Sequence, residues 1–428
     1  MAQSSSAASQ APPLPPGCRH LNDVYIVPDE GVSALSRQLL EGCIRRTFRD
    51  AAQFTQLIEQ GADPRAVGGL RVHGTSGRCT LSRCSCLCLA IDSQTNVAFL
   101  DADGYFPAIV RVVLPQWSSR QLQRDVINAL IDGGAEMNGG GFEQRPITVA
   151  VRAGSEATVE ALLARQANLR GLRVIYELPD IGSAAPPATR DYEAALMSIY
   201  RRLLRHDSTL AAERVGGNSL IHLAATARSI FSQSFIDAYL TLVTSHGADM
   251  TATDDIGRTP LHWAARTGSH CVAHWLCRQL TAYDVNRGMP NETPLAVAAH
   301  ELDFYRRQYQ GERRQRRIRA HKTTIGVLLR GGAAPSIARM PTATEGQRRQ
   351  RQLVLAEYAT VLSELSEVVM SAINGALAPQ RDHSMLLARL LPLAPHHDGA
   401  HPHPSPSNMA FGPHEAEAIA WKIGAFLH

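Results

Sequence analysis

The sequence lacks the features that define several large classes of protein. It has no run of about 18 apolar residues, and its most apolar short piece, AIVRVVL from Ala108, contains Arg111, so we expect no membrane span. The first 17 residues have neither a basic segment nor an apolar one, which predicts no secretory signal. We therefore expect an intracellular, cytoplasmic protein with reduced thiols.

Cysteine, net charge and catalytic motifs are also scarce. Eight cysteines in 428 residues are too few and too unevenly placed for a disulfide scaffold. A formal net charge of +4 is small for this length and argues against a nucleic-acid binder. The sequence holds no G-x-x-x-x-G-K-[ST], H-E-x-x-H or G-x-S-x-G motif and no dinucleotide glycine fingerprint. We expect no enzymatic activity and no cofactor.

The clearest pattern that is present is GRTPLHWAARTGSHCVAHWLCRQLTAYDVN, residues 257–286. Thr259 is a good helix N-cap, and Pro260 suits the first helical position. Gly268 can adopt the left-handed conformation that ends a helix, and a second amphipathic helix follows it. Because such a helix pair cannot bury its apolar faces alone, the pattern predicts stacked copies.

Copies of this pattern are found on both sides. Thr293 begins a copy 34 residues after Thr259, and Ser219 occupies the capping place 40 residues before it. Fainter copies lie nearer the N-terminus, as in residues 145–168 and in the second-helix ending around Gly134. This T-P-L-H-x-A-A pattern resembles the ankyrin repeat family, whose period is about 33 residues.

The resemblance implies an all-α fold, an ankyrin-repeat solenoid of stacked helix-turn-helix units with long insertions and a helical C-terminal extension. We predict a disordered Ser/Pro-rich tail over residues 1–30 and an array of about six or seven repeats, some degenerate, over residues 31–336. Residues 337–428 are predicted to form the helical extension, with a Pro/His-rich loop. We expect a monomer.

Three repeats are predicted to carry insertions between their two helices, at about residues 95–120, 179–189 and 301–322. The last insertion holds the arginine run Arg306–Arg319, which overlaps the basic stretch 313–322. Such a run could be a nuclear-import signal, an RNA contact or a docking site for an acidic partner. We favour a solvated helix extension, because few aromatic residues are interleaved with the arginines.

Four cysteines, Cys79, Cys84, Cys86 and Cys88, are clustered at one point of the chain. Their spacing, C-x4-C-x-C-x-C, lacks the two pairs that are typical of zinc sites. Aligning SCLCLAI with TPLHWAA puts Ser85 on the N-cap and the apolar residues on the core positions. We therefore interpret the segment as the start of a repeat's first helix, without a metal; a metal shared by the thiols is the alternative.

The resemblance implies a non-enzymatic scaffold or adaptor that binds partner proteins through the concave face of the solenoid. In the family, contacts come from variable residues at the turn tips and on the first helix. In the best copy these residues are Asp255, Ile256, Arg258, Trp263, Arg266 and Thr267; in its neighbours they are Met289, Glu292 and His300, and Asn218 and Thr226.

Two other functions stay open at this point. One is a multidomain regulator in which the repeats deliver a C-terminal effector region, residues 340–428. The other is a nuclear or RNA-associated protein that works through Arg306–Arg319, for which binding should fall steeply with salt.

Overall fold

The structure is a computed structural model. It describes residues 18–73, 83–93, 100–103, 109–139, 144–171, 187–226, 230–289, 292–308 and 311–364. The chain divides into two compact units, Met1–Val354 and Leu355–His428. The predicted boundary between residues 336 and 337 therefore lies 18 residues before the division between the units. No helix of the described residues is both long and apolar enough to cross a membrane.

The described chain is mostly helical, as predicted. The α-helices are α1 (Ala34–Arg45), α2 (Ala52–Glu59), α3 (Cys86–Leu89), α4 (Arg120–Asp132), α5 (Pro146–Arg152), α6 (Glu156–Ala164), α7 (Arg190–His206), α8 (Leu220–Ala224), α9 (Gln233–Ser245), α10 (Pro260–Thr267), α11 (His270–Gln279), α12 (Ala282–Val285), α13 (Pro294–Gln308), α14 (Glu312–Leu328) and α15 (Pro335–Arg339). Single turns of other helix types are η1 (Leu21–Asp23), η3 (Ser208–Ala212) and η4 (Leu329–Ala333), and residues 345–364 form a further helix.

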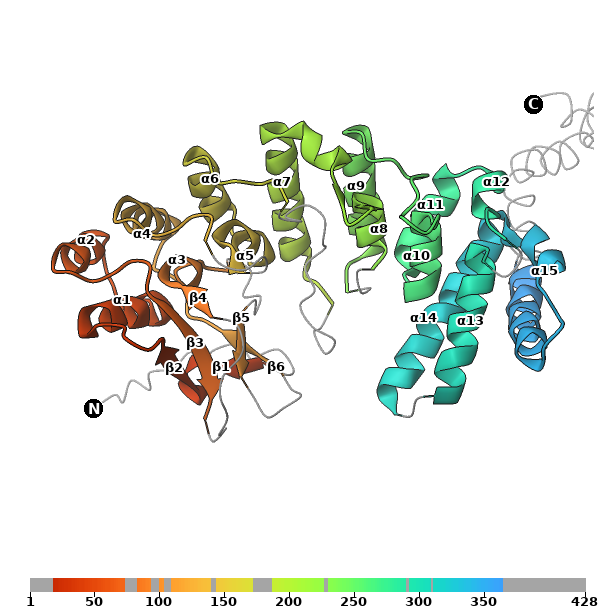
Figure 1. The fold of residues 1–428 in the computed structure, drawn as a ribbon, viewed down its shortest axis with the longest axis horizontal. Helices are drawn as coiled ribbons and strands as arrows, with labels where there is room; N and C mark the ends of the chain where they lie inside the picture. The colour runs from red at the N-terminus through yellow and green to blue at the C-terminus, as the bar shows by residue number, and fades with distance from the viewer. Residues whose placement is uncertain are drawn as a thin grey trace, which may run out of the picture. The chain divides into compact units, whose positions relative to one another are not determined.

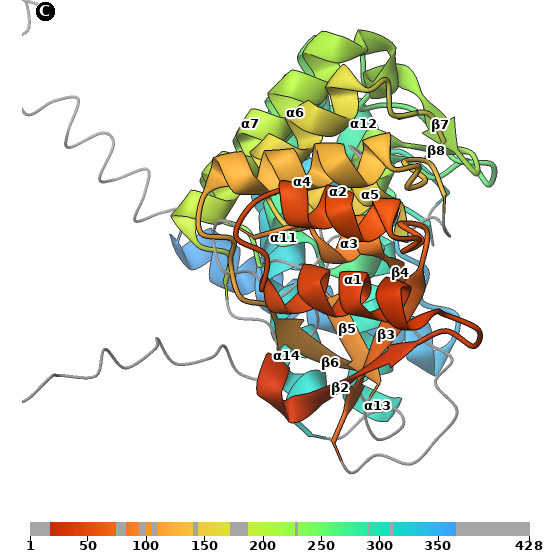
Figure 2. The ribbon, with the colours of Figure 1, turned by 90° about the vertical axis from the view of Figure 1, so that its left-hand side faces the viewer.

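In the first unit the helices form two layers that follow the order of the chain (Figures 1 and 2). One layer consists of α2, α4, α6, α7, α9, α11 and α14, each in contact with the next. In the other layer α1 contacts α3 and α3 contacts α5, while α8 contacts α10 and α10 contacts α13. The core between the layers includes the fully buried rings of Tyr192, Tyr200 and Tyr239. Each helix pair therefore buries its apolar faces against its neighbours, as the repeat pattern predicts.

Local sequence signals set the ends of these helices. Thr259 and His262 form a capping box at the start of α10, Pro260 is its first residue, and Gly268 ends it in the left-handed conformation at φ 76°. Ser232 caps α9 in the same manner, its hydroxyl accepting a hydrogen bond from the third amide of the helix. The predicted start and end of α10 are thus confirmed.

The prediction of an all-α fold is incomplete, because the first unit also contains a six-stranded sheet. Its order is β1-β6-β5-β3-β2, with β4 paired to β3. The strands are β1 (Cys18–His20), β2 (Val24–Pro28), β3 (Val67–Val72), β4 (Cys84–Ser85), β5 (Leu100–Asp103) and β6 (Ile109–Val113), and a separate hairpin joins β7 (Arg214–Val215) to β8 (Asn218–Ser219).

The predicted extent of the disordered tail is corrected by this sheet. The tail was expected to be disordered to residue 30, but residues 18–20 and 24–28 are strands β1 and β2; residues 1–17 lie outside the described residues. β1 pairs in parallel with β6, which belongs to the insertion expected at residues 95–120. A short strand gains its hydrogen bonds from a partner about 90 residues away, so its local composition does not reveal it.

The insertion expected at residues 301–322 is also different from a loop. The first helix of this repeat continues to Gln308 and the second begins at Glu312, so the added residues lengthen both helices. This is the solvated helix extension that the sequence favoured. The insertion expected at 179–189 lies outside the described residues except for residues 187–189.

Candidate functional site

The turn that precedes α10 is held by one carboxylate. Asp254 Oδ1 accepts hydrogen bonds from the backbone amides of Ile256 at 3.0 Å and Arg258 at 2.8 Å. Its Oδ2 accepts one from the indole Nε1 of Trp263 at 2.9 Å. Burial by itself raises the pKa of Asp254, but the hydrogen bonds from Arg258 and Trp263 outweigh it and lower the pKa below its ordinary value. The carboxylate is therefore ionised near neutral pH and fixes the backbone of the turn.

The turns on either side of this repeat present large apolar side chains to solvent. Ile256 is 69% exposed, Tyr283 of α12 is 77% exposed and Met289 is 65% exposed. Asp255 is exposed beside Ile256, and its carboxylate lies so close to Gly217 of the preceding turn that a β-carbon there would collide with it. We call Asp255, Ile256, Tyr283 and Met289 the turn-tip surface. These residues lie on the turn before α10, on α12 and on the turn after α12.

Three of these four residues were expected from the sequence as contact residues, and Tyr283 was not. The preceding copy ends its second helix in Gly-Ala-Asp, residues 247–249, whereas Tyr283 lies in the sequence Thr-Ala-Tyr-Asp at the corresponding place. An aromatic residue in a segment that normally holds glycine is the signal that could have identified it.

The two histidines of the repeat pattern have a structural role. His222 Nδ1 accepts a hydrogen bond from Ser219 Oγ at 2.8 Å, and its Nε2 donates one to the carbonyl of Arg258 at 3.0 Å, in the next repeat. His262 Nδ1 accepts from Thr259 Oγ1 at 2.7 Å in the same geometry. Burial lowers the pKa of both rings, that of His262 to about 4. Both are therefore neutral near pH 7 and tie one repeat to the next.

Three predicted contact residues use their side chains within the fold. Thr267 Oγ1 donates a hydrogen bond to the carbonyl of Ala225, in the preceding repeat, at 2.5 Å. Thr226 Oγ1 donates to the carbonyl of Leu223 at 2.6 Å, and Asn218 Nδ2 donates to the carbonyl two residues before it at 3.1 Å. Their polar groups stabilise the helix ends and turns, so these groups are less available for hydrogen bonds with a partner.

Four predicted residues remain, which are Arg258, Trp263 and Arg266 of the best copy and Glu292 of the following copy. Trp263 is half-buried, with the guanidinium of Arg266 5.7 Å from its ring centroid and the edge of His222 on another side at 6.5 Å. Arg258 is half-buried and Glu292 is exposed. Arg258 and Arg266 supply positive charge and Glu292 supplies negative charge.

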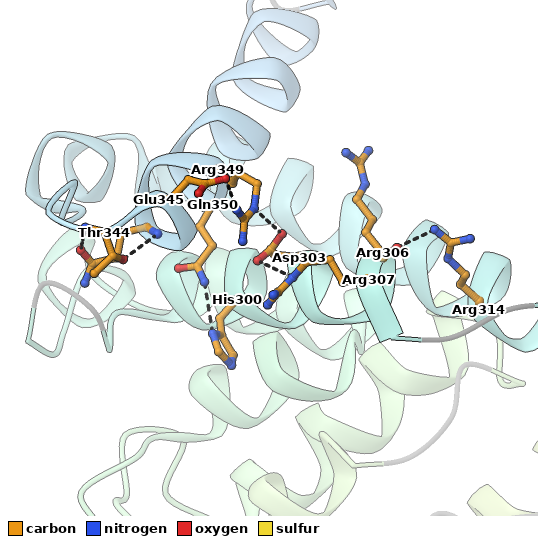
Figure 3. A network of polar contacts seen from close by, with 10 residues as sticks. His300, Asp303, Arg306, Arg307, Arg314, Thr344, Glu345, Arg349 and Gln350 are labelled. Carbon is orange, nitrogen blue, oxygen red and sulfur yellow. Dashed lines mark hydrogen bonds and ion pairs between the residues drawn. The ribbon is translucent and has the colours of Figure 1, made fainter.

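His300 contacts the C-terminal part of the first unit. Gln350 Nε2 lies 3.3 Å from His300 Nδ1, and Arg349 Nε lies 3.5 Å from Asp303 Oδ1 (Figure 3). Residues 345–354 thus lie against α13. The start of the predicted C-terminal extension therefore packs on α13, and His300 lies beside it.

The cysteine cluster is built into the core. α3 begins where the alignment predicted, and Ser85 Oγ accepts a hydrogen bond from the amide of Cys88 at 3.3 Å. Cys84 and Cys88 are buried; the Cys88 thiol donates to the carbonyl of Gln144 at 2.9 Å, and burial raises its pKa to about 11. Cys79 lies outside the described residues. Within the described ranges, no three metal-binding side chains are grouped together.

Comparison with known proteins identifies one repeat. The family model of the ankyrin repeat matches residues 256–288, which begin and end on the turns of the turn-tip surface. A search of curated proteins finds no match to the chain. An ankyrin repeat is a protein-interaction module, so protein partners are the class of ligand that this match indicates.

Proposed function

We propose that this protein is a non-enzymatic scaffold or adaptor that binds a partner protein through the turn-tip surface of an ankyrin-like array. The observation that carries the proposal is the exposure of Ile256, Tyr283 and Met289 on the turns that flank one repeat. Single exposed apolar residues are common on protein surfaces, but three of this size on the turns that flank one repeat, with charged residues in the same turns, favour an interaction site.

The chemistry of the surface defines what the partner must offer. Ile256 and Met289 favour apolar side chains, and Tyr283 adds a large ring with a hydroxyl that can form a hydrogen bond. Asp255 and Arg258 supply opposite charges that orient the partner and exclude wrong ones. Since Asp254 fixes the first turn through three hydrogen bonds, little conformational entropy is lost there on binding.

The test is a comparison of variants in partner capture. In Ile256→Asp/Met289→Asp, we expect loss of the proteins captured by the wild-type chain, with at least about a tenfold decrease in affinity for an identified partner, because two apolar contacts are replaced by charges. Tyr25→Asp is the matched control, since Tyr25 is 56% exposed on β2, far along the chain. Equal binding by the double variant and wild type would reject the turn-tip surface.

A second function is supported by the division of the chain at residues 354 and 355. A separate unit Leu355–His428 is compatible with a regulator whose repeats deliver a C-terminal effector region. A chain that ends at Glu364 distinguishes the two functions. A scaffold keeps its full cellular effect after this truncation, whereas an effector-delivering regulator binds its partner but loses the effect.

A further inference from the structure

The repeat formed by α13 and α14 is longer than its neighbour. α13 has 15 residues and α14 has 17, whereas α10 has 8 and α11 has 10. At about 1.5 Å per residue, the seven added residues extend each helix by about 10 Å. Figure 1 shows both helices reaching beyond α10 and α11 at the end where they are joined. We call residues 303–308 and 311–322 the arginine hairpin.

Positive charge is concentrated in and around this hairpin. Residues 301–354 contain 13 arginines and lysines and four acidic residues, a net charge of +9, while the whole chain has a net charge of +4. The rest of the chain is therefore acidic overall. A surface whose charge is opposite to that of the rest of its chain is a candidate for long-range attraction of an anionic partner.

The arginines are displayed on both helices and on the helix that follows. Arg306 and Arg319 are exposed, and the guanidinium of Arg314 donates to the carbonyl of Arg306 at 2.5 Å, which holds the two helices of the tip together (Figure 3). Asp303 is 3% exposed and forms ion pairs with Arg307 at 3.3 Å and with an arginine of the following helix. This carboxylate neutralises part of the positive charge at the end of the hairpin that adjoins the other repeats.

One arginine of the hairpin lies in an electrostatically unfavourable position when no anion is bound. Arg314 lies in the first turn of α14, where the positive end of the helix dipole disfavours a cation. An anion bound at this place would remove the repulsion and gain charge-assisted hydrogen bonds from the guanidinium groups. The arrangement is therefore more stable with an acidic ligand than without it.

The two aromatic residues of the hairpin that the structure describes, Phe304 and Tyr305, pack within it. The ring of Tyr305 stacks on His321 at 5.4 Å and also lies 5.7 Å from the guanidinium of Arg317, and Phe304 packs edge-on against Tyr305 at 5.6 Å. Single-stranded nucleic acids are bound mainly by stacking of bases on exposed aromatic rings between basic side chains. Tyr305 and Phe304 are engaged and half-buried, which favours an acidic polypeptide over RNA.

From these observations we propose that the arginine hairpin docks an acidic segment of a partner protein by charge complementarity. The site is separate from the turn-tip surface, and the proposal does not depend on it. Several carboxylates in an extended segment would meet the guanidinium groups of both helices, which can each form two parallel hydrogen bonds with a carboxylate.

The test measures binding of a fluorescent oligo-glutamate peptide to the full chain at about 50 and about 200 mM salt. We expect salt-sensitive binding by wild type and a loss of at least about tenfold in Arg306→Glu/Arg319→Glu. Arg306→Lys/Arg319→Lys keeps the charge and should retain most of the binding. The matched control is Arg37→Glu/Arg201→Glu, which reverses two exposed arginines on α1 and α7 and should change binding less than about twofold.

Two results would overturn the proposal. One is equal peptide binding by the hairpin variant and the control variant. The other is binding of a single-stranded RNA oligonucleotide as tight as or tighter than that of the peptide, which would identify a nucleic-acid surface. Capture of partners by the turn-tip surface is measured separately, so failure of one site leaves the other result intact.

Discussion

At the scale of single residues, this protein uses buried polar side chains as links between repeats. His222 joins Ser219 to the carbonyl of Arg258 in the following repeat, and Asp254 gathers two backbone amides and an indole. A buried polar group without a partner costs about 1–3 kcal/mol, so these links are much more expensive to break than their net contribution suggests. They hold the turns that carry the exposed apolar side chains.

Protonation of His262 should make the protein less stable in mild acid. Its folded pKa is about 4 and its ordinary value is 6.5, mainly because the ring is buried. Above pH 6.5 the ring is neutral in both states, and the full stability is present. Between about pH 6.5 and pH 4 only the unfolded chain binds the proton, so the free energy of unfolding falls by about 1.4 kcal/mol per pH unit. His321, with a folded pKa of about 4, acts in the same direction.

Urea denaturation at a series of pH values between 7 and 5 measures this effect. In His262→Asn, the slope of the unfolding free energy against pH should be smaller by about 1.4 kcal/mol per unit, although the variant is less stable at every pH. His321→Asn should remove a similar share of the slope. An unchanged slope in both variants would show that the buried rings do not cause the acid sensitivity.

At the scale of elements, the last repeat depends on the chain that follows it. Among the described residues no further repeat lies beside α13, and residues 345–354 contact it through Arg349 and Gln350 (Figure 3). Met340 and Val354 are buried in the same unit, at 5% and 0% exposure. A repeat array needs a cap at its end because an unpaired terminal repeat exposes an apolar face.

Truncation should therefore depend on where the chain ends. A chain that ends at Ser336 should lose about 3–6 kcal/mol of stability, from the buried side chains of Met340 and Val354. A chain that ends at Glu364 keeps these residues and should melt within a few degrees of the full protein. Differential scanning calorimetry of the two chains makes the comparison, and equal melting temperatures would exclude a capping role.

A pair of point variants tests the same contact without truncation. Arg349→Ala leaves the buried carboxylate of Asp303 with one fewer cation and should cost about 1–3 kcal/mol. Arg348→Ala, its exposed neighbour, is the control and should change stability by less than about 0.5 kcal/mol.

At the scale of the whole molecule, helix pairs contact mainly the pairs beside them in the chain. Contacts run from α9 to α11 and from α11 to α14 within one layer, and from α8 to α10 and from α10 to α13 within the other. Stability is then a sum of contributions from single repeats and from the interfaces between neighbours. The two surfaces proposed to bind partners, the turn-tip surface and the arginine hairpin, lie on successive repeats.

Double variants should show this dependence on distance. Leu261 and Leu295 are fully buried in adjacent pairs, and Leu39 is fully buried in the first pair. Each Leu→Ala change should cost about 2–5 kcal/mol. The costs of Leu261→Ala and Leu295→Ala should deviate from additivity by more than about 0.5 kcal/mol, whereas Leu261→Ala and Leu39→Ala should add. Equal coupling in both pairs would argue against a linear array. Calorimetry or urea denaturation gives the unfolding free energies of wild type, the three single variants and the two double variants.

The sequence by itself determined the ends of α10 and the start of α3, within the cysteine cluster. Thr259, Pro260 and Gly268 mark the start and end of α10, and Ser85 caps α3 as the alignment predicted. These features are local: a cap bonds to an amide three residues away, and a glycine adopts its left-handed conformation without help from distant residues. The same locality explains why Asp255, Ile256 and Met289 were correctly expected to lie in exposed turns.

Only the tertiary structure decided the features that depend on distant partners. β1 becomes a strand because β6, about 90 residues later, supplies its hydrogen bonds, and His300 is drawn beside Gln350 of the capping helix. The exposure of Tyr283 is likewise set by how the repeats pack. Periodicity within a segment reports its own apolar face, whereas what covers that face is decided by the rest of the chain.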